Sequence, residues 1–153
     1  MTNGDLRRIL DEALEDERKA EATYAAVLAK FGEVRPFSNI IDAERRHSSA
    51  IERQMARLGF PIPPNNWEGR APIPASLAEA CRDAVQAEVE NIALYDRLLP
   101  TIADGTVRQV LENLQAASRD NHLPAFRRCL AHEDGKGGGG FRRSGRGRCI
   151  AGD

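Results

Sequence analysis

The chain has 153 residues, of which 41% are hydrophobic and 29% charged, and its formal net charge is −1. This length suits one domain with a buried core and is short for two. No apolar run approaches the roughly 18 residues of a membrane-spanning helix, and the first residues lack the apolar core of a signal peptide, so we expect a cytoplasmic protein without a membrane span.

Four amphipathic segments are predicted to form helices, and they cover about residues 5–31, 36–58, 76–99 and 105–132. Gly32 and Gly59 are typical helix stops. Ser76-Leu77-Ala78-Glu79 is a capping box that opens the third segment. A tight turn at residues 104–106 precedes the fourth. Nothing in the pattern predicts a strand.

The connections between these segments are short, long and short. Short connections join antiparallel neighbours, whereas the Pro- and Gly-rich segment from Gly59 to Ala75 must cross the bundle. One long crossover between two helical hairpins is the ferritin-like arrangement. We therefore expect an all-α domain, a ferritin-like four-helix bundle, over residues 1–134. The Gly- and Arg-rich remainder, residues 135–153, is expected to be a disordered basic tail.

Carboxylates and imidazoles lie on the apolar faces of these helices. Glu44 and His47 share one face with Ile40, Ile41 and Ile51. The other apolar faces carry Glu17 with Tyr24, Glu88 with Tyr95, and His122. In both Glu–Tyr pairs the Tyr follows seven residues after the Glu, so the two hairpins resemble a weak internal repeat.

Each of these residues alone is compatible with an ordinary helical core: Tyr24 and Tyr95 as core residues with satisfied hydroxyls, for example. Three unpaired carboxylates facing one interior would instead cost several kcal/mol each. A pair of divalent ions offsets that cost, and carboxylates with imidazoles suit iron or manganese. The ferritin-like di-iron pattern has one Glu from each of two helices and Glu-x-x-His from the other two. We therefore predict a metal site made of Glu17, Glu44, His47, Glu88 and His122.

The fourth helix departs from this pattern, because Arg119 stands where a second Glu-x-x-His would have its Glu. Arg119 is expected at the edge of the face and outside the ligand set. Two Fe²⁺ ions would then keep one uncompensated positive charge, which a hydroxide or Glu21 could balance. A single bound metal ion is the alternative.

Several stretches carry a resemblance to a known family. They are Glu17-RKAEAT-Tyr24, Pro36 to Ile40, Glu44-RR-His47, Glu88-VENIA and Asn121 to Phe126. Through them the chain resembles the ferritin-like superfamily and is most similar to its DUF2202 branch, over about residues 6–130. The resemblance implies the same five metal positions, and in that branch the position of Arg119 is generally not Glu either. It implies no settled activity.

Two functional hypotheses follow. The first is a non-haem di-iron protein that holds two Fe ions, or Mn, and reacts with O₂ or peroxide while oxidising Fe²⁺, with Tyr24 and Tyr95 assisting beside the metals. Since the chain has no four-cysteine domain, an electron donor would be a separate protein. We also expect a homodimer. The second hypothesis is a non-catalytic helical scaffold whose metal site is structural or vestigial.

The cysteines and the tail complete the sequence-based expectations. Cys81, Cys129 and Cys149 form no CxxC motif, and we expect them to be reduced thiols. The tail has arginines around a single aromatic residue, Phe141. This resembles RGG-type segments that bind nucleic acid, but the signal is weak, and we do not expect nucleic-acid binding.

Overall fold

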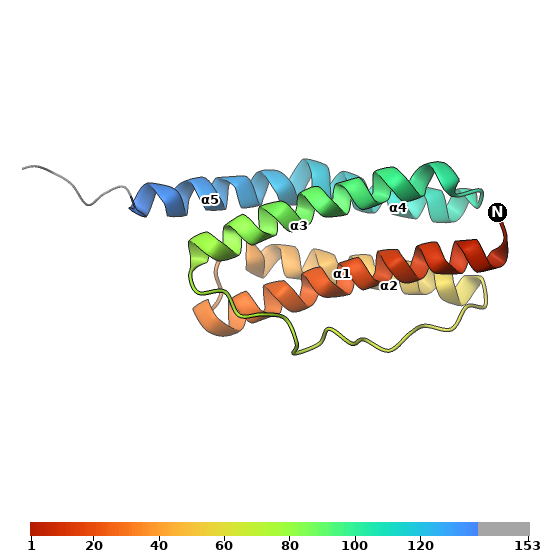
Figure 1. Ribbon diagram of the computed structural model, residues 1–153, viewed down its shortest axis with the longest axis horizontal. Helices are drawn as coiled ribbons and strands as arrows, with labels where there is room; N and C mark the ends of the chain where they lie inside the picture. Colours follow the sequence, from red (N-terminus) through yellow and green to blue (C-terminus); the bar gives the residue numbers. More distant parts are fainter. Residues whose placement is uncertain (138–153) are drawn as a thin grey trace, which may run out of the picture.

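The computed structural model describes residues 1–137 and folds them into a bundle of antiparallel helices (Figure 1). The helices are α1 (Asn3–Phe31), α2 (Phe37–Arg57), α3 (Leu77–Leu98), α4 (Gly105–Ala117) and α5 (Leu123–Gly137). A short 3₁₀ turn, η1 (Leu99–Thr101), follows α3, and a π-helical turn, η2 (Ser118–His122), joins α4 to α5. Residues 1–137 contain no strand, so the predicted all-α bundle is confirmed.

Three of the helices begin at side-chain caps. Thr2 and Asp5 form a capping box at α1. Ser76 accepts a hydrogen bond from the Glu79 N–H at α3, and Asp104 accepts from the first turn of α4. These caps satisfy backbone N–H groups that have no partner inside the helix. The helix starts therefore lie close to their predicted positions, whereas the last helix continues to Gly137, beyond the predicted end at His132.

The crossover between α2 and α3 runs along the length of the bundle beside α1 (Figure 1). Side chains of α1, including Arg18 and Glu15, hold it in place. The guanidinium of Arg18 donates to the Pro63 carbonyl at 2.8 Å and pairs with Glu52 of α2 at 3.0 Å. Glu15 accepts a hydrogen bond from Trp67 Nε1 at 2.6 Å. The long connection is thus attached to the hairpin that it leaves.

The bundle has four rods: α1, α2, α3 and a continuous helix formed by α4, η2 and α5. This fourth rod contains one wide turn in its middle. In η2 the Leu123 N–H donates to the Ser118 carbonyl, five residues back. The next residue, Pro124, has no N–H and would crowd the carbonyl four residues earlier in a regular α-helix. A wider turn just before the proline relieves this conflict. Its last residue is His122.

The apolar core consists of two clusters. One includes Leu10, Leu14, Ile51, Met55 and Leu111. The other includes Tyr24, Phe37, Cys81, Ala84 and Phe126. On each helix the polar buried residues fall between the segments that supply the two clusters. The polar layer is therefore enclosed by hydrophobic packing on both sides.

Cys81 of α3 and Cys129 of α5 form a disulfide bond in this structure. The expectation of reduced thiols is therefore wrong for these two residues. It relied on the absence of a CxxC motif, but the antiparallel packing of α3 on α5 brings these two cysteines together. Cys149 and most of the expected basic tail lie outside the described residues. Among residues 1–137, every helix is too short or too polar to span a lipid bilayer.

Candidate metal centre

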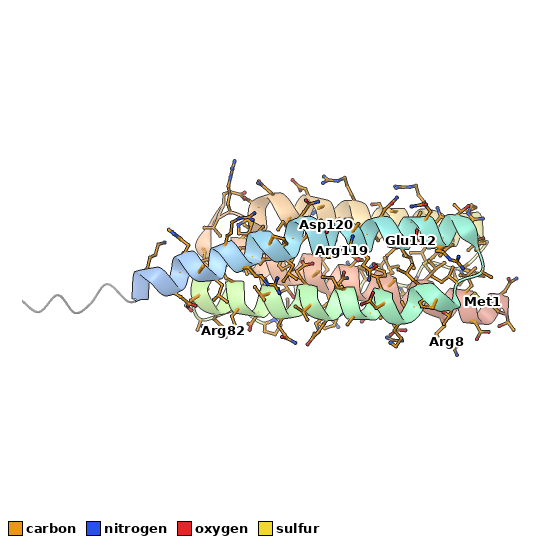
Figure 2. All side chains as sticks on the ribbon, turned by 90° about the horizontal axis from the view of Figure 1, so that it is seen from above. Met1, Arg8, Arg82, Glu112, Arg119 and Asp120 are labelled. Carbon is orange, nitrogen blue, oxygen red and sulfur yellow. A yellow bond between two sulfur atoms is a disulfide. The ribbon has the colours of Figure 1, made fainter. Side chains whose placement is uncertain are left out.

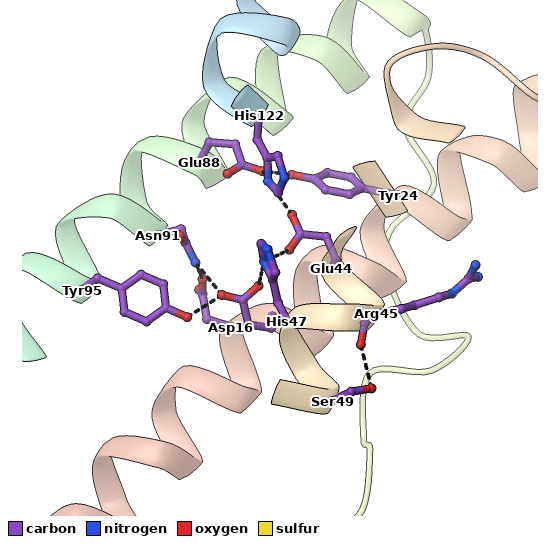
Figure 3. Close-up of polar contacts among 11 residues, drawn as sticks. Asp16, Tyr24, Glu44, Arg45, His47, Ser49, Glu88, Asn91, Tyr95 and His122 are labelled. Carbon is purple, nitrogen blue, oxygen red and sulfur yellow. Dashed lines mark hydrogen bonds and ion pairs between the residues drawn. The ribbon is translucent and has the colours of Figure 1, made fainter. Parts of the chain in front are cut away.

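Each of the four rods of the bundle contributes to one buried cluster of carboxylates and imidazoles (Figure 3). The cluster contains Glu17 from α1, Glu44 and His47 from α2, Glu88 from α3 and His122 from η2. Their exposed fractions run from 1% for Glu17 to 9% for His47. The structure thus brings together all five residues that the sequence singled out. That they bind metal stays a prediction at this point.

Glu44 lies at the middle of the cluster. Its Oε2 is 3.1 Å from Nδ1 of His47, and its Oε1 is 3.1 Å from Nδ1 of His122. The two oxygens of one carboxylate therefore face two different imidazoles. The imidazole rings are nearly parallel, with centroids 5.4 Å apart.

The other two carboxylates lie at opposite ends. Glu17 Oε2 is 3.1 Å from Nδ1 of His47, and Glu88 Oε1 is 3.6 Å from Nδ1 of His122. The cluster therefore divides into two groups that share Glu44: Glu17 with His47, and Glu88 with His122. In each group, ligand atoms from all three residues lie within 4.8 Å of one another.

The two tyrosines bind these carboxylates crosswise. Tyr24 of α1 donates a hydrogen bond to Glu88 of α3 at 2.7 Å, and Tyr95 of α3 donates one to Glu17 of α1. Each hairpin thus holds the carboxylate of the other (Figure 3). Burial and then the nearby carboxylates raise the pKa of both phenols well above 10, so both stay neutral donors.

Asp16 and Asn91 belong to the same polar layer, and the sequence analysis missed both. Asn91 Nδ2 donates to Asp16 Oδ2 at 2.7 Å and to Glu17 Oε1 at 3.3 Å. Asn91 is buried and follows Glu88 by three residues, which places the two side chains on one face of α3. That spacing was the available signal for Asn91.

In the absence of metal, protons on the imidazoles balance the carboxylates. Burial lowers the pKa of His47, but hydrogen bonds with Glu17 and Glu44 outweigh it and raise this pKa to about 10. Burial also opposes charging of His122, and the neighbouring Glu44 and Glu88 raise its pKa to about 9. Both imidazoles are therefore cationic at neutral pH.

Glu17 and Glu44 shift in opposite directions. Burial, and then the charge of Glu44, raises the pKa of Glu17 to about 7. Burial also acts to raise the pKa of Glu44, but the adjacent imidazoles of His122 and His47 lower it overall. Glu44, the central carboxylate, is therefore more fully ionised than Glu17.

The chemistry of the donor set fits a pair of divalent ions. His122 Nδ1 is buried and makes no hydrogen bond of acceptable geometry, although two carboxylates lie close to it. The nitrogen thus has two carboxylates within ion-pair distance but no well-directed hydrogen bond, and a buried polar atom without one is rare. A cation between this nitrogen and the carboxylates would satisfy it, and oxygen with imidazole ligands is typical of iron or manganese.

Two other polar residues lie outside the cluster. Arg119 and Asp120 face outward on the rod formed by α4 and α5 (Figure 2) and pair with each other at 2.9 Å. Arg119 thus lies away from the ligand atoms, as its position at the edge of the face predicted. Glu21, considered above as a source of compensating charge, instead pairs with Arg45 at 3.3 Å.

Comparisons with known proteins identify the fold. No family profile and no curated protein matches the chain, so membership of the DUF2202 branch has no support from them. A hypothetical protein of Methanococcus jannaschii superposes with a TM-score of 0.77 at 23% identity, over 88% of this chain and 83% of that one. A bacterioferritin of Mycobacterium tuberculosis superposes with a TM-score of 0.74 at 19% identity, over 88% of this chain and 89% of that one. The chain therefore has the ferritin-like fold, with a buried group of Glu and His residues that could hold metal.

Proposed function

We propose that this chain is a non-haem di-iron protein that reacts with O₂ or peroxide. The proposal rests on the position of Glu44. Its two carboxylate oxygens lie 3.1 Å from Nδ1 of His47 and 3.1 Å from Nδ1 of His122. A carboxylate placed between two imidazoles in this way would help to hold a divalent ion in each of the two ligand groups that share it. The M. tuberculosis neighbour is a bacterioferritin, which favours iron over other divalent metals.

The ligand groups divide the ions between the two hairpins. Glu17, His47 and Glu44 would hold one ion, and Glu88, His122 and Glu44 the other. Three carboxylates supply three negative charges against the four positive charges of two Fe²⁺ ions. The remaining positive charge favours an additional anionic ligand such as hydroxide. So few protein ligands leave coordination positions open for an oxidant.

Two ferrous ions would supply the two electrons that the reduction of one peroxide molecule needs. One peroxide molecule would accept one electron from each Fe²⁺ and two protons, and would leave as two water molecules. A separate electron donor would then return the iron to the ferrous state. Tyr24 and Tyr95 touch Glu88 and Glu17, where they would hold the ligands and could take up stray oxidising equivalents.

The test is metal content after anaerobic loading with Fe²⁺. We expect about two irons per chain in the wild type, as in other ferritin-like carboxylate centres. Glu44→Ala combined with His47→Ala should lose them. A matched surface control is Glu112→Ala with His132→Ala, since both of these residues are exposed. Addition of peroxide should then oxidise the bound Fe²⁺, with an increase in near-ultraviolet absorbance.

One observation favours a second candidate, a helical scaffold with a structural or vestigial metal site. The rod of α4 and α5 supplies His122 without a carboxylate, because residue 119 is an arginine and faces outward. One metal ion per chain, without any absorbance change on oxidation, would support this candidate. No specific metal binding would overturn the di-iron proposal.

A further inference from the structure

A small cavity between α1 and α3 connects the protein surface to the metal centre. It has a volume of about 40 Å³, and its lining includes the exposed residues Lys19 and Glu90 and the buried residues Glu44 and Glu88. One water needs roughly 10–15 Å³ of such volume. The cavity therefore has room for about three water-sized groups, which suits an ion that has shed part of its hydration shell.

Asp16 and Asn91 line this cavity beside the buried cluster. Asn91 is 6% exposed, and its Nδ2 donates hydrogen bonds to Asp16 and Glu17. Its Oδ1 is buried and has no hydrogen-bond partner. Buried carbonyl oxygens without a partner are rare in proteins. A carboxylate and an amide oxygen together are ligands for a hard divalent cation.

The charges along the cavity also favour a cation. Asp16 and Glu90 are acidic, and Lys19 is the basic residue of the lining. The ammonium group of Lys19 lies 5.6 Å from the ring centroid of Trp67 in the crossover, where a cation–π contact holds it. A cleft with an excess of negative charge concentrates cations and speeds their association.

We propose that this cavity is the uptake route for Fe²⁺, and that Asp16 and the Oδ1 of Asn91 bind the ion transiently before it reaches Glu44 and Glu88. This inference rests on the proposed di-iron function. It adds a second binding position, outside the five ligands, whose role is kinetic. Asp16 should therefore control how fast metal binds and not how much is bound.

The experiment measures the rate and the final extent of metal uptake separately. Fe²⁺ is mixed anaerobically with the full-length metal-free protein, and bound iron is determined after quenching with a chelator at increasing times. Asp16→Asn removes the charge but keeps an acceptor for Asn91. Glu112→Gln removes a negative charge on the exposed side of α4, away from the route (Figure 2). A second route variant, Ala87→Leu, narrows the cavity without a change of charge.

We expect Asp16→Asn to slow uptake about ten-fold at low salt and to weaken its salt dependence, with unchanged final iron content. Ala87→Leu should also slow uptake, and Glu112→Gln should not. Wild-type rates in both route variants would overturn the uptake route but leave the di-iron site intact. A lower final iron content in Asp16→Asn, at an unchanged rate, would overturn it too, because Asp16 would then support the centre itself. No iron bound by the wild type would instead overturn the proposed function.

Discussion

Glu44 differs from the other carboxylates of the centre because both of its oxygens face an imidazole. Glu17 and Glu88 each face one imidazole and receive a tyrosine hydroxyl as well. At Glu17 and Glu88, a tyrosine hydroxyl therefore takes the place that a second imidazole has at Glu44. This division explains how three acidic side chains can be buried together without an arginine or lysine among them.

The first prediction concerns these tyrosine hydrogen bonds. Tyr95→Phe removes the hydroxyl group that donates a hydrogen bond to Glu17, and leaves this buried carboxyl group with one hydrogen-bond donor fewer. We expect the metal-free protein to lose about 1.5–3 kcal/mol of unfolding free energy, as for other hydrogen bonds to charged groups. Urea unfolding measures this change. Tyr24→Phe, which acts on Glu88, should have an effect of similar size, and no loss in either variant would contradict the role of the pair.

The second prediction is the pH dependence of the metal-free protein. In the folded state the pKa values of His47, His122 and Glu17 are raised to about 10, 9 and 7. A group whose pKa is higher in the folded state stabilises it while protonated. That contribution is complete below the unfolded pKa and is lost as the pH rises through the folded pKa. For the two imidazoles this window runs from pH 6.5 to about 10.

We therefore expect the urea midpoint of the metal-free protein to fall between pH 6.5 and pH 10 when a chelator is present. Loss of the Glu17 proton begins lower, above pH 4.5, and acts in the same direction. Glu44→Ala with His47→Ala should flatten the profile, because it removes the central carboxylate and one imidazole. A midpoint that rises with pH over this range would contradict the protonation states given above.

At the scale of the helix, the wide turn of η2 decides what the last rod can contribute. Helical periodicity predicted His122 on the inner face, but it treated Arg119 and His122 as members of one regular α-helix. Pro124 was the signal for an irregular turn, because a proline inside a long helix removes a hydrogen bond. A pattern of 3.6 residues per turn cannot show which neighbouring turn widens to accommodate it.

The third prediction follows from this turn. Arg119→Glu restores the sequence Glu-x-x-His on the last rod, but residue 119 faces solvent beside Asp120 (Figure 2). We expect neither more bound metal nor tighter binding than in the wild type, measured by metal analysis and calorimetry. Arg119→Gln is the control for loss of the positive charge. A ten-fold gain in affinity in Arg119→Glu alone would show that residue 119 can reach the centre.

The disulfide has a simple relation to the metal centre. Cys81 lies seven residues before Glu88, and Cys129 lies seven residues after His122. In antiparallel helices, positions displaced equally in opposite directions from a contact also face each other. Since Glu88 and His122 meet in the centre, the two cysteines meet about two turns away. The bond was therefore predictable once that contact was assumed, but not from cysteine spacing alone.

The fourth prediction tests this bond in a Cys149→Ser background, which leaves only the cysteine pair of α3 and α5. The bond spans 48 residues, and an entropic estimate for a loop of this size is about 4 kcal/mol. We expect reduction to lower the urea midpoint clearly. A variant with Cys81→Ser and Cys129→Ser should resemble the reduced protein and be insensitive to the reductant. An unchanged midpoint on reduction would contradict the stabilising role.

At the scale of the whole molecule, the fold was predictable because its signals are local. Caps such as Ser76, stops such as Gly32, and one long connection together specify two hairpins with a crossover. The faces of the helices likewise identified the five clustered residues. The crossed tyrosine contacts, Asn91 and the disulfide depend on which helix packs against which, and a single sequence gives no direct measure of that.

The last prediction concerns what metal would do to the bundle as a whole. The two ligand groups share Glu44 and together include residues of α1, α2, α3 and η2. Two bound metal ions would therefore connect the two hairpins at mid-length, between the apolar clusters. Ligands that bind only the folded state stabilise it by mass action. At a free Fe²⁺ concentration 100 times the Kd, this amounts to about 2.7 kcal/mol per site.

We therefore expect anaerobic Fe²⁺ to raise the urea midpoint of the wild type, and a chelator to reverse the change. Glu44→Ala with His47→Ala should show no shift, and Asp16→Asn should show the full shift once loading is complete. That last comparison separates the two roles argued above, since the centre acts on stability and the cavity only on rate. Iron that binds without raising the midpoint would place the metal at the surface, away from the junction of the two hairpins.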